Sequence, residues 1–160
     1  MNASSAQANL TLTSQSFKAN SPIPSKYGYV PNENISPQLS WTAGPKGTKS
    51  YAIICRDPDA PTKEWVHLVA FNIPVTMQGL PEGALSKASS GISLGTNDYG
   101  KTGYGGPKPP SGTHRYYFDV YALGVELSQL TEKTTKANLL QAMQGHILAK
   151  GSLMGTYKAT

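Results

Sequence analysis

The hydrophobic and polar positions along the chain mostly follow the two-residue period of β-strands. The clearest alternating segments are residues 65–73 and 114–123, in which every second side chain lies on the same face of a sheet. Residues 50–56 form a continuous apolar run, which is typical of a buried strand. Weaker patterns predict further strands at residues 10–17, 36–41 and 151–157.

The two alternating segments each carry a histidine at one end of an apolar face. In the first segment the shared face holds Trp65, His67, Val69, Phe71 and Ile73. In the second it holds His114, Tyr116, Phe118, Val120 and Ala122. If the two strands belong to one sheet, both imidazole rings can open onto one cavity at the strand ends.

One segment, residues 135–149, has the spacing of an amphipathic helix. Residues 76–113 are dense in glycine and proline, and irregular segments of this length are often functional. Many strands with few helices predict a mainly β fold, an antiparallel β-sandwich with one or two peripheral helices.

The composition fits a loop-rich β protein. The 160 residues suit a single domain, expected at residues 10–160 behind a flexible tail at residues 1–9. Charged residues make up 14% of the chain, against about 25% in typical domains. The net charge of +5 weakly favours anionic partners, but no basic run predicts nucleic-acid binding. No apolar stretch approaches the ~18 residues of a membrane span.

Cys55 is the single cysteine, so an internal disulfide and cysteine-based zinc sites are excluded. It lies in an apolar run and is expected to be an inert core residue. Ala6-Gln7-Ala8 has the shape of a signal-peptidase site, but the apolar segment that precedes such sites is missing. The prediction is a cytoplasmic protein, and a periplasmic or exported protein remains the alternative.

Several polar groups suggest an anion site. Asp57-Pro58-Asp59-Ala60-Pro61 follows the apolar strand directly and predicts a rigid turn. The imidazoles of His67 and His114 and the phenol of Tyr116 can donate hydrogen bonds to an anion, and Asp57 can fix one ring's tautomer. The backbone N–H groups of residues 103–110, a Gly-rich run, can approach a ligand closely. Together these groups suit phosphate, sulfate or carboxylate.

Other interpretations remain open at this stage. Each group alone is typical of a strand-end turn or a packed polar residue, and Arg115 is expected to pair with an acid such as Asp119. Asp57, His67 and His114 could also form a hydrolytic or metal site, although no Gly-x-Ser-x-Gly elbow is present. A third alternative is a protease or kinase inhibitor that acts through the loops.

The chain resembles the phosphatidylethanolamine-binding proteins, also called Raf kinase inhibitor-like proteins, and in particular their bacterial and archaeal branch. The similarity spans residues 35–157 and includes Asn97-Asp98-Tyr99-Gly100. The motifs that carry the resemblance are Asp57-Pro58-Asp59-Ala60-Pro61, Trp65-Val66-His67, Gly105-Gly106-Pro107-Lys108-Pro109-Pro110 and Gly112-Thr113-His114-Arg115-Tyr116.

This resemblance implies a β-sandwich with Greek-key connections and a non-enzymatic, cofactor-free pocket for a phosphate-type anion, such as a phospholipid headgroup or a phosphorylated ligand. It also implies a homodimer with no metal site. By this resemblance, the longer insert and the C-terminal helix of eukaryotic members are expected to be absent here. By matching position, the implied pocket residues are Asp57, Ala60, Pro61, His67, Gly105, Gly106, Pro109, His114 and Tyr116.

Overall fold

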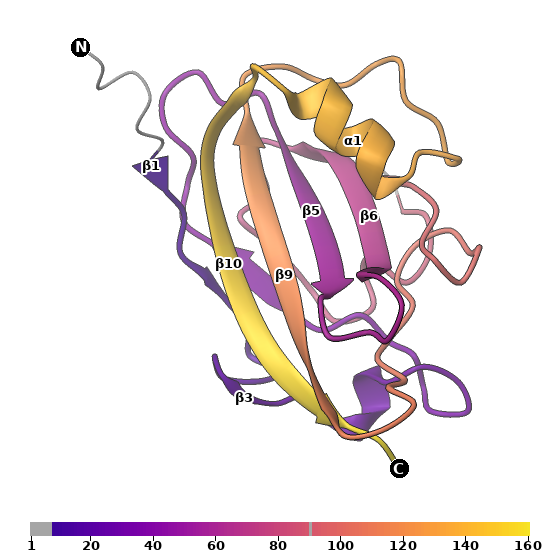
Figure 1. Cartoon of the computed structure of the whole chain (residues 1–160). Helices are drawn as coiled ribbons and strands as arrows, with labels where there is room; N and C mark the ends of the chain where they lie inside the picture. The colour runs from indigo at the N-terminus through magenta and orange to yellow at the C-terminus, as the bar shows by residue number, and fades with distance from the viewer. Residues whose placement is uncertain (1–7, 90) are drawn as a thin grey trace.

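The computed structural model describes residues 8–89 and 91–160, which form two β-sheets and one α-helix (Figure 1). Sheet A has the strand order β1-β10-β9-β5-β6-β8, with β3 also paired to β10, and sheet B has the order β2-β4-β7. The elements are β1 (Ala8–Asn9), β2 (Leu12–Thr13), β3 (Ser21–Pro22), the 3-10 helix η2 (Ser25–Tyr27), β4 (Leu39–Trp41), β5 (Ser50–Asp57), β6 (Trp65–Pro74), β7 (Gly79–Leu80), β8 (Ser93–Leu94), β9 (Thr113–Leu123), α1 (Lys136–Met143) and β10 (Ile147–Lys158).

The main core lies between the two sheets, as in a β-sandwich. Leu39 and Trp41 of β4 are buried there against Tyr51 and Ile53 of β5. The rings of Trp41 and Tyr51 meet edge to face, with centroids 5.4 Å apart. The central pairs of sheet A are antiparallel, whereas β1 and β3 run parallel to β10. The predicted β-sandwich with a peripheral helix is confirmed.

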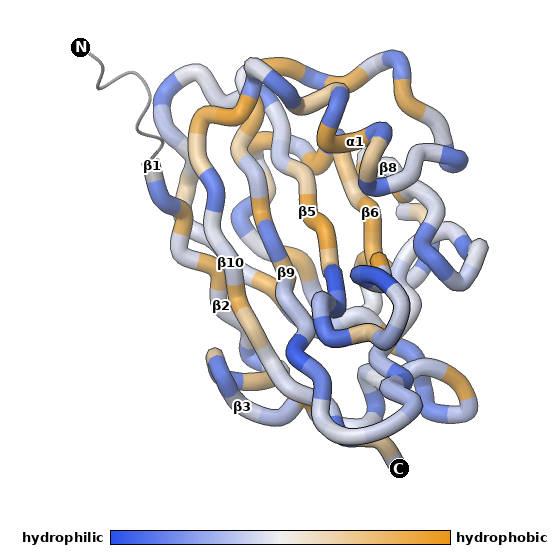
Figure 2. Tube along the Cα trace, viewed as in Figure 1, coloured by the Kyte–Doolittle hydropathy of each residue, from blue (hydrophilic) through white to orange (hydrophobic). Residues whose placement is uncertain are grey.

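A second core forms where α1 covers the outer face of sheet A (Figure 1). Leu139 and Met143 of the helix are fully buried against Ile54, Val69 and Phe71. Figure 2 shows hydrophobic residues along β5 and β6 beneath the helix. Because α1 crosses only one end of the sheet, the opposite end of this face remains free for polar side chains. Within the described ranges, no helix has the length and apolar character that a membrane span requires.

The predicted shared face is confirmed for β9 but wrong for β6. Tyr116 and every second residue after it pack in the inter-sheet core. In β6, however, the pairing with β5 shifts register twice, and Asn72 adopts a φ of 52°. Each shift moves the following side chains to the other face. As a result Val69 and Phe71 pack under α1, whereas Ile73 packs between the sheets.

The predicted helix at residues 135–149 is too long, because α1 ends at Met143. Thr135 begins the helix with a reciprocal cap: its hydroxyl accepts from the Asn138 N–H, and the Asn138 side chain accepts from the Thr135 N–H. At the other end, Gly145 has a φ of +84°, which turns the chain out of the helix. Residues from Ile147 onward join β10, so the predicted closing strand at residues 151–157 is present but longer.

The N-terminal prediction is only partly confirmed. The strand expected at residues 10–17 is reduced to β2, because side chains take over the backbone bonding that follows it. Ser14 donates to the Gln38 carbonyl, and the Gln15 N–H donates to the Gln38 side chain at 2.7 Å. Of the expected tail, residues 1–7 lie outside the described residues, while β1 pairs with β10.

Between β6 and β9, the described residues of the long glycine- and proline-rich segment form two named strands, β7 and β8, each of two residues. Buried Asn97 organises its middle part: its Oδ1 accepts from the N–H groups of Tyr99 and Lys101, and its Nδ2 donates to the Gly103 carbonyl. The segment then runs past the end of β6, where the Gly105 N–H donates to the His67 carbonyl at 2.8 Å.

Candidate functional site

Three ends of strands in sheet A surround a hollow of about 230 Å³, here called the strand-end pocket. Asp57 ends β5, Trp65 opens β6 and pairs with Asp57, and His114 lies at the start of β9. The pocket is lined by Asp57, Ala60, Pro61, Trp65, His67, Tyr99, Lys108, Pro109, Pro110, His114 and Tyr116. The predicted convergence of two histidines and an aspartate on one hollow is therefore present.

Asp57 and His114 form a buried pair. The carboxylate Oδ2 lies 2.6 Å from the His114 Nδ1, and the other oxygen accepts the Asp59 N–H at 2.8 Å. An ionised carboxylate only accepts hydrogen bonds, so Nδ1 carries the proton. The other ring nitrogen, Nε2, is then a hydrogen-bond acceptor when the ring is neutral and a donor when it is charged.

His67 is fixed in the same way by a backbone group. Its Nδ1 lies 2.6 Å from the Gly105 carbonyl oxygen, so it donates to that oxygen. The side chain is 2% exposed, and this burial lowers the pKa of His67, with the Gly105 contact opposing the shift. A neutral His67 offers an acceptor at Nε2, and it becomes a donor only when it takes up a proton. His67 therefore differs from the sequence expectation of two donating rings.

Two buried donors in the pocket wall have no hydrogen-bond partner among the described residues: the Trp65 Nε1–H and the Tyr116 hydroxyl. Burial raises the pKa of Tyr116, and the charge of Asp57 and a side-chain interaction with it add to the shift, so the phenol keeps its proton. The Tyr116 hydroxyl thus lies near Asp57 but makes no hydrogen bond of normal geometry with it. Leaving such groups unpaired costs about 1–3 kcal/mol each, and buried polar groups in proteins are nearly always bonded. The pocket is thus suited to a ligand that carries acceptors. Trp41 Nε1 is also unpartnered, but it does not line the pocket and nothing in the structure explains it.

Tyr99 forms an aromatic wall of the pocket. Its hydroxyl donates to the Gly106 carbonyl at 2.8 Å, and its ring stacks on Tyr29 with centroids 3.8 Å apart. The ring also meets Trp65 and His67 edge on. At Gly105 a Cβ would collide with the Tyr99 ring, so only glycine lets the backbone approach this closely.

The role expected for Gly105 and Gly106 is not supported, because neither residue lines the strand-end pocket. Their N–H groups are already used within the protein: Gly105 donates to the His67 carbonyl, and Gly106 donates to the Asn34 side chain at 2.7 Å. The two glycines instead position His67 and Tyr99 through their carbonyl oxygens. The other seven predicted residues do line the pocket, and ligand binding by them stays a prediction.

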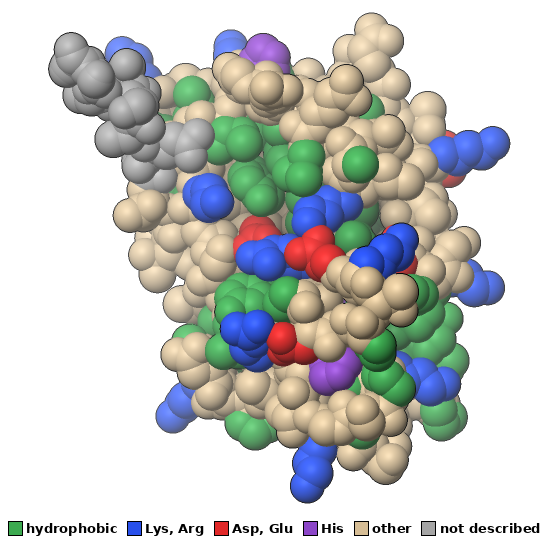
Figure 3. Space-filling view, viewed as in Figure 1, with side chains coloured by type: hydrophobic (Ala, Val, Ile, Leu, Met, Phe, Trp, Pro, Cys, Tyr) green, Lys and Arg blue, Asp and Glu red, His purple; other side chains and the backbone are tan. Residues whose placement is uncertain are grey.

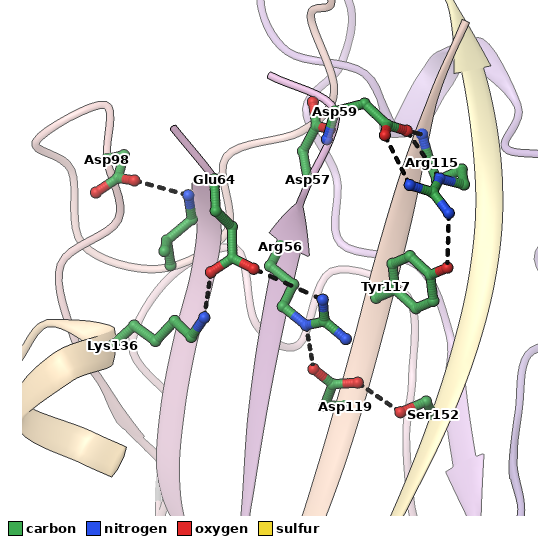
Figure 4. Close-up of polar contacts among 11 residues, drawn as sticks. Arg56, Asp57, Asp59, Glu64, Asp98, Arg115, Tyr117, Asp119, Lys136 and Ser152 are labelled. Carbon is green, nitrogen blue, oxygen red and sulfur yellow. Dashed lines mark hydrogen bonds and ion pairs between the residues drawn. The ribbon is translucent and has the colours of Figure 1, made fainter. Parts of the chain in front are cut away.

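A polar network on the outer face of sheet A holds the Asp57–Pro61 turn in place (Figures 3 and 4). Arg115 donates to both oxygens of Asp59 at 2.8 and 2.9 Å, and this contact lowers the pKa of Asp59 to about 2. Arg115 therefore pairs with an acid as expected, but the acid is Asp59 and not Asp119, which accepts from Arg56 at 2.7 Å and from Ser152 at 2.5 Å. Figure 3 shows basic and acidic side chains interleaved across this face.

The site residues predicted from the sequence do not include Trp65, Tyr99, Lys108 and Pro110, which also line the pocket. Three of them belong to the irregular segment before β9, where no period assigns side chains to a face. The sequence did contain a signal for these residues, because they lie inside the motifs that carry the family resemblance. Among the described residues, no group of three His, Cys, Asp or Glu side chains is placed to hold a metal ion.

Comparison with known proteins identifies the family. The sequence profile of the family described as phosphatidylethanolamine-binding protein matches residues 13–158. A UPF0098 protein of Methanothermobacter thermautotrophicus is 45% identical over 151 residues, covering 93% of this chain and 99% of its own length.

Two crystal structures have the same fold. A phosphatidylethanolamine-binding protein homologue from Chlamydia trachomatis superposes with a TM-score of 0.86 at 41% identity, covering 97% of this chain and all of its own. The Escherichia coli protein YbcL, described as a member of the mammalian family, gives 0.88 at 32% identity, covering 96% of this chain and all of its own. The chain belongs to the phosphatidylethanolamine-binding protein family.

Proposed function

We propose that this protein is a non-enzymatic binding protein that holds a small phosphate-type anion in the strand-end pocket. The observation that carries the proposal is the pair of buried donors without partners, the Trp65 indole N–H and the Tyr116 hydroxyl. Both residues line the strand-end pocket. The tetrahedral oxygens of phosphate can accept from two such donors at once, and the His114 Nε2 adds a third donor when its ring is charged.

The size of the pocket supports a small ligand. Its volume of about 230 Å³ lies below the roughly 300–1,000 Å³ of pockets for drug-sized molecules. A phosphate group with a short substituent fits this scale, as in a phospholipid headgroup or a small phosphorylated metabolite. The aromatic and proline side chains around the donors exclude water, which strengthens hydrogen bonds to an anion.

The lining favours binding over covalent catalysis. No serine, threonine or cysteine side chain is among the described lining residues, so the Asp57–His114 pair has no aliphatic hydroxyl or thiol to activate there. Water activated by His114 would be the remaining hydrolytic route. We therefore expect no turnover of phosphate or carboxylate esters above that of a His114→Ala variant.

The decisive variant is Tyr116→Phe, tested by calorimetric titration with inorganic phosphate. Removing one hydrogen bond to an anion costs about 1.5–3 kcal/mol, so the affinity should fall by at least about tenfold. The free protein should lose little stability, because this hydroxyl lies near Asp57 but makes no hydrogen bond of normal geometry within the described residues. This combination separates a ligand role from a structural one.

Tyr117→Phe is the matched control. Tyr117 is the next residue of β9, and its hydroxyl accepts from Arg115 at 3.4 Å on the opposite face (Figure 4). It should bind phosphate like the wild type. Equal affinity of wild type and Tyr116→Phe, or no heat and no shift of histidine NMR signals at millimolar phosphate, would refute the proposal.

A further inference from the structure

Asp57, His67 and His114 supply little positive charge to the strand-end pocket. The Asp57 carboxylate lies beside the His114 ring and offsets a positive charge on it. Burial lowers the pKa of His67, which keeps this ring neutral near pH 7. An anion that enters therefore meets hydrogen-bond donors but no net charge from these three groups, and a carboxylate lies beside it. A source of positive charge is required for strong binding of a doubly charged ligand.

Lys108 is the described lining residue with a permanent positive charge. Its side chain is exposed, and its Nζ lies 5.8 Å from the centre of the Tyr29 ring. Tyr29 is stacked on Tyr99, so the ammonium group rests on an aromatic pair of which Tyr99 lines the strand-end pocket. No carboxylate among the described residues pairs with Lys108.

The position of Lys108 between two hollows allows its ammonium group to move. It lines the strand-end pocket and also a neighbouring hollow of about 100 Å³, with Pro109 as the other shared residue. The two adjacent prolines, Pro107 and Pro109, restrict the backbone, so the movement belongs to the side chain. A contact with one ring at the surface is weak, and a bound anion competes with it easily.

We infer that Lys108 is a specificity-determining residue, whose side chain turns from the Tyr29 ring toward the bound ligand and selects dianionic phosphate monoesters over monoanionic phosphate diesters. This inference rests on the proposed function of the pocket. The physical reason is that a fixed cation attracts a double charge about twice as strongly as a single one at the same distance. A monoester also carries close to two charges near neutral pH, because its second pKa is about 6.

The test compares methyl phosphate with dimethyl phosphate at pH 8 by calorimetric titration. The variant is Lys108→Met, which keeps an unbranched side chain beside Tyr29 and removes the charge. We expect it to lose about tenfold in affinity for methyl phosphate, which corresponds to about 1.4 kcal/mol, and about threefold for dimethyl phosphate. Lys108→Arg should keep the selectivity of the wild type.

Lys150→Met is the control for net charge. Lys150 is an exposed residue of β10 and pairs with Tyr121, seven positions along β9 from His114. This variant should bind both ligands like the wild type. Equal losses of Lys108→Met for the two ligands, or affinities within twofold of wild type, would overturn the inference and leave the proposed function standing. Failure of the wild type to bind either ligand would overturn both.

Discussion

Replacing Asp57 with asparagine should change the pH dependence of anion binding in a way that only the observed geometry predicts. In the wild type, the Asp57 carboxylate accepts a hydrogen bond from the His114 Nδ1 at 2.6 Å and another from the Asp59 N–H at 2.8 Å. The His114 Nε2 can therefore donate to an anion only when the ring is charged. Wild-type affinity should therefore be lower at pH 8 than at pH 5, because a His114 ring that has lost its charge presents an acceptor at Nε2.

In the Asp57→Asn variant, the His114 Nε2 no longer needs a charged ring in order to donate. Its amide oxygen takes over the Asp59 N–H, and its NH₂ group then faces the His114 Nδ1 and donates to it. The neutral ring adopts the other tautomer, with the proton on Nε2, where it can donate to an anion without a charge. The same substitution removes a negative charge from the pocket wall.

The expected magnitude follows from proton linkage. If binding requires the charged ring, each pH unit above the titration range lowers affinity up to tenfold, so the loss between pH 6 and pH 8 reaches at most about a hundredfold. For Asp57→Asn we expect an affinity that is constant within about twofold, and higher than wild type at pH 8. Sulfate is the suitable probe for calorimetry, because its own charge does not change in this range.

Two results would refute this reasoning. A wild-type affinity for sulfate that is constant from pH 5 to pH 8 would mean that the Trp65 and Tyr116 donors bind without help from His114. A variant that retains the wild-type pH dependence would mean that the titrating group is not His114. Denaturation curves of the wild type and of Asp57→Asn at each pH check that both proteins are folded under the conditions of the titrations.

The remaining predictions concern the groups that support the pocket. Gly105→Ala should displace the Tyr99 ring, destabilise the fold by about 1–3 kcal/mol and weaken phosphate binding. Gly124→Ala is the control, because a Cβ at Gly124 makes only ordinary contacts. Equal effects of the two variants would contradict the close approach of the Gly105 backbone to the Tyr99 ring. Asp59→Asn should lower the free energy of unfolding by about 1 kcal/mol at pH 7, after allowing for the exposure of Arg115. Because folding lowers the pKa of Asp59 from 3.8 to about 2, this stabilisation is present above pH 4 and is lost as the pH falls toward 2. Urea unfolding of wild type and variant at both ends of this range checks the sign, and a difference that persists at the acidic end would contradict it.

The sequence predicted the parts of the fold in which local pattern and tertiary structure agree. Strand β9 pairs with both neighbours without a register shift from Tyr117 to Ala122, so the alternation of its residues matches their burial. Strand β6 has the same alternation in sequence, but bulges at its pairing with β5 reverse the faces, and no local signal marks them. The predicted helix is too long because Ile147 and Leu148 continue the helical spacing of apolar residues. In the structure, Gly145 turns the chain out of the helix before these residues.

The site was predictable where its residues lie on strands. His67, His114 and Asp57 sit at strand ends, so the topology of one sheet brings them together. Lys108 and Tyr99 come from irregular backbone, whose path depends on contacts such as the Asn97 bonds and the close approach at Gly105. The sequence predicts that the N–H groups of Gly105 and Gly106 can bind an anion, because it does not reveal the groups within the protein to which they donate.

The homodimer implied by the family resemblance stays a prediction, and light scattering of the purified protein tests it.

A crystal structure of the protein grown or soaked with inorganic phosphate tests the central claim most directly. The account predicts a phosphate in the strand-end pocket with oxygens at hydrogen-bond distance, about 2.7–3.2 Å, from the Trp65 Nε1 and the Tyr116 hydroxyl. A pocket that holds only water at saturating phosphate, or a phosphate bound elsewhere while both donors remain unpartnered, would contradict it.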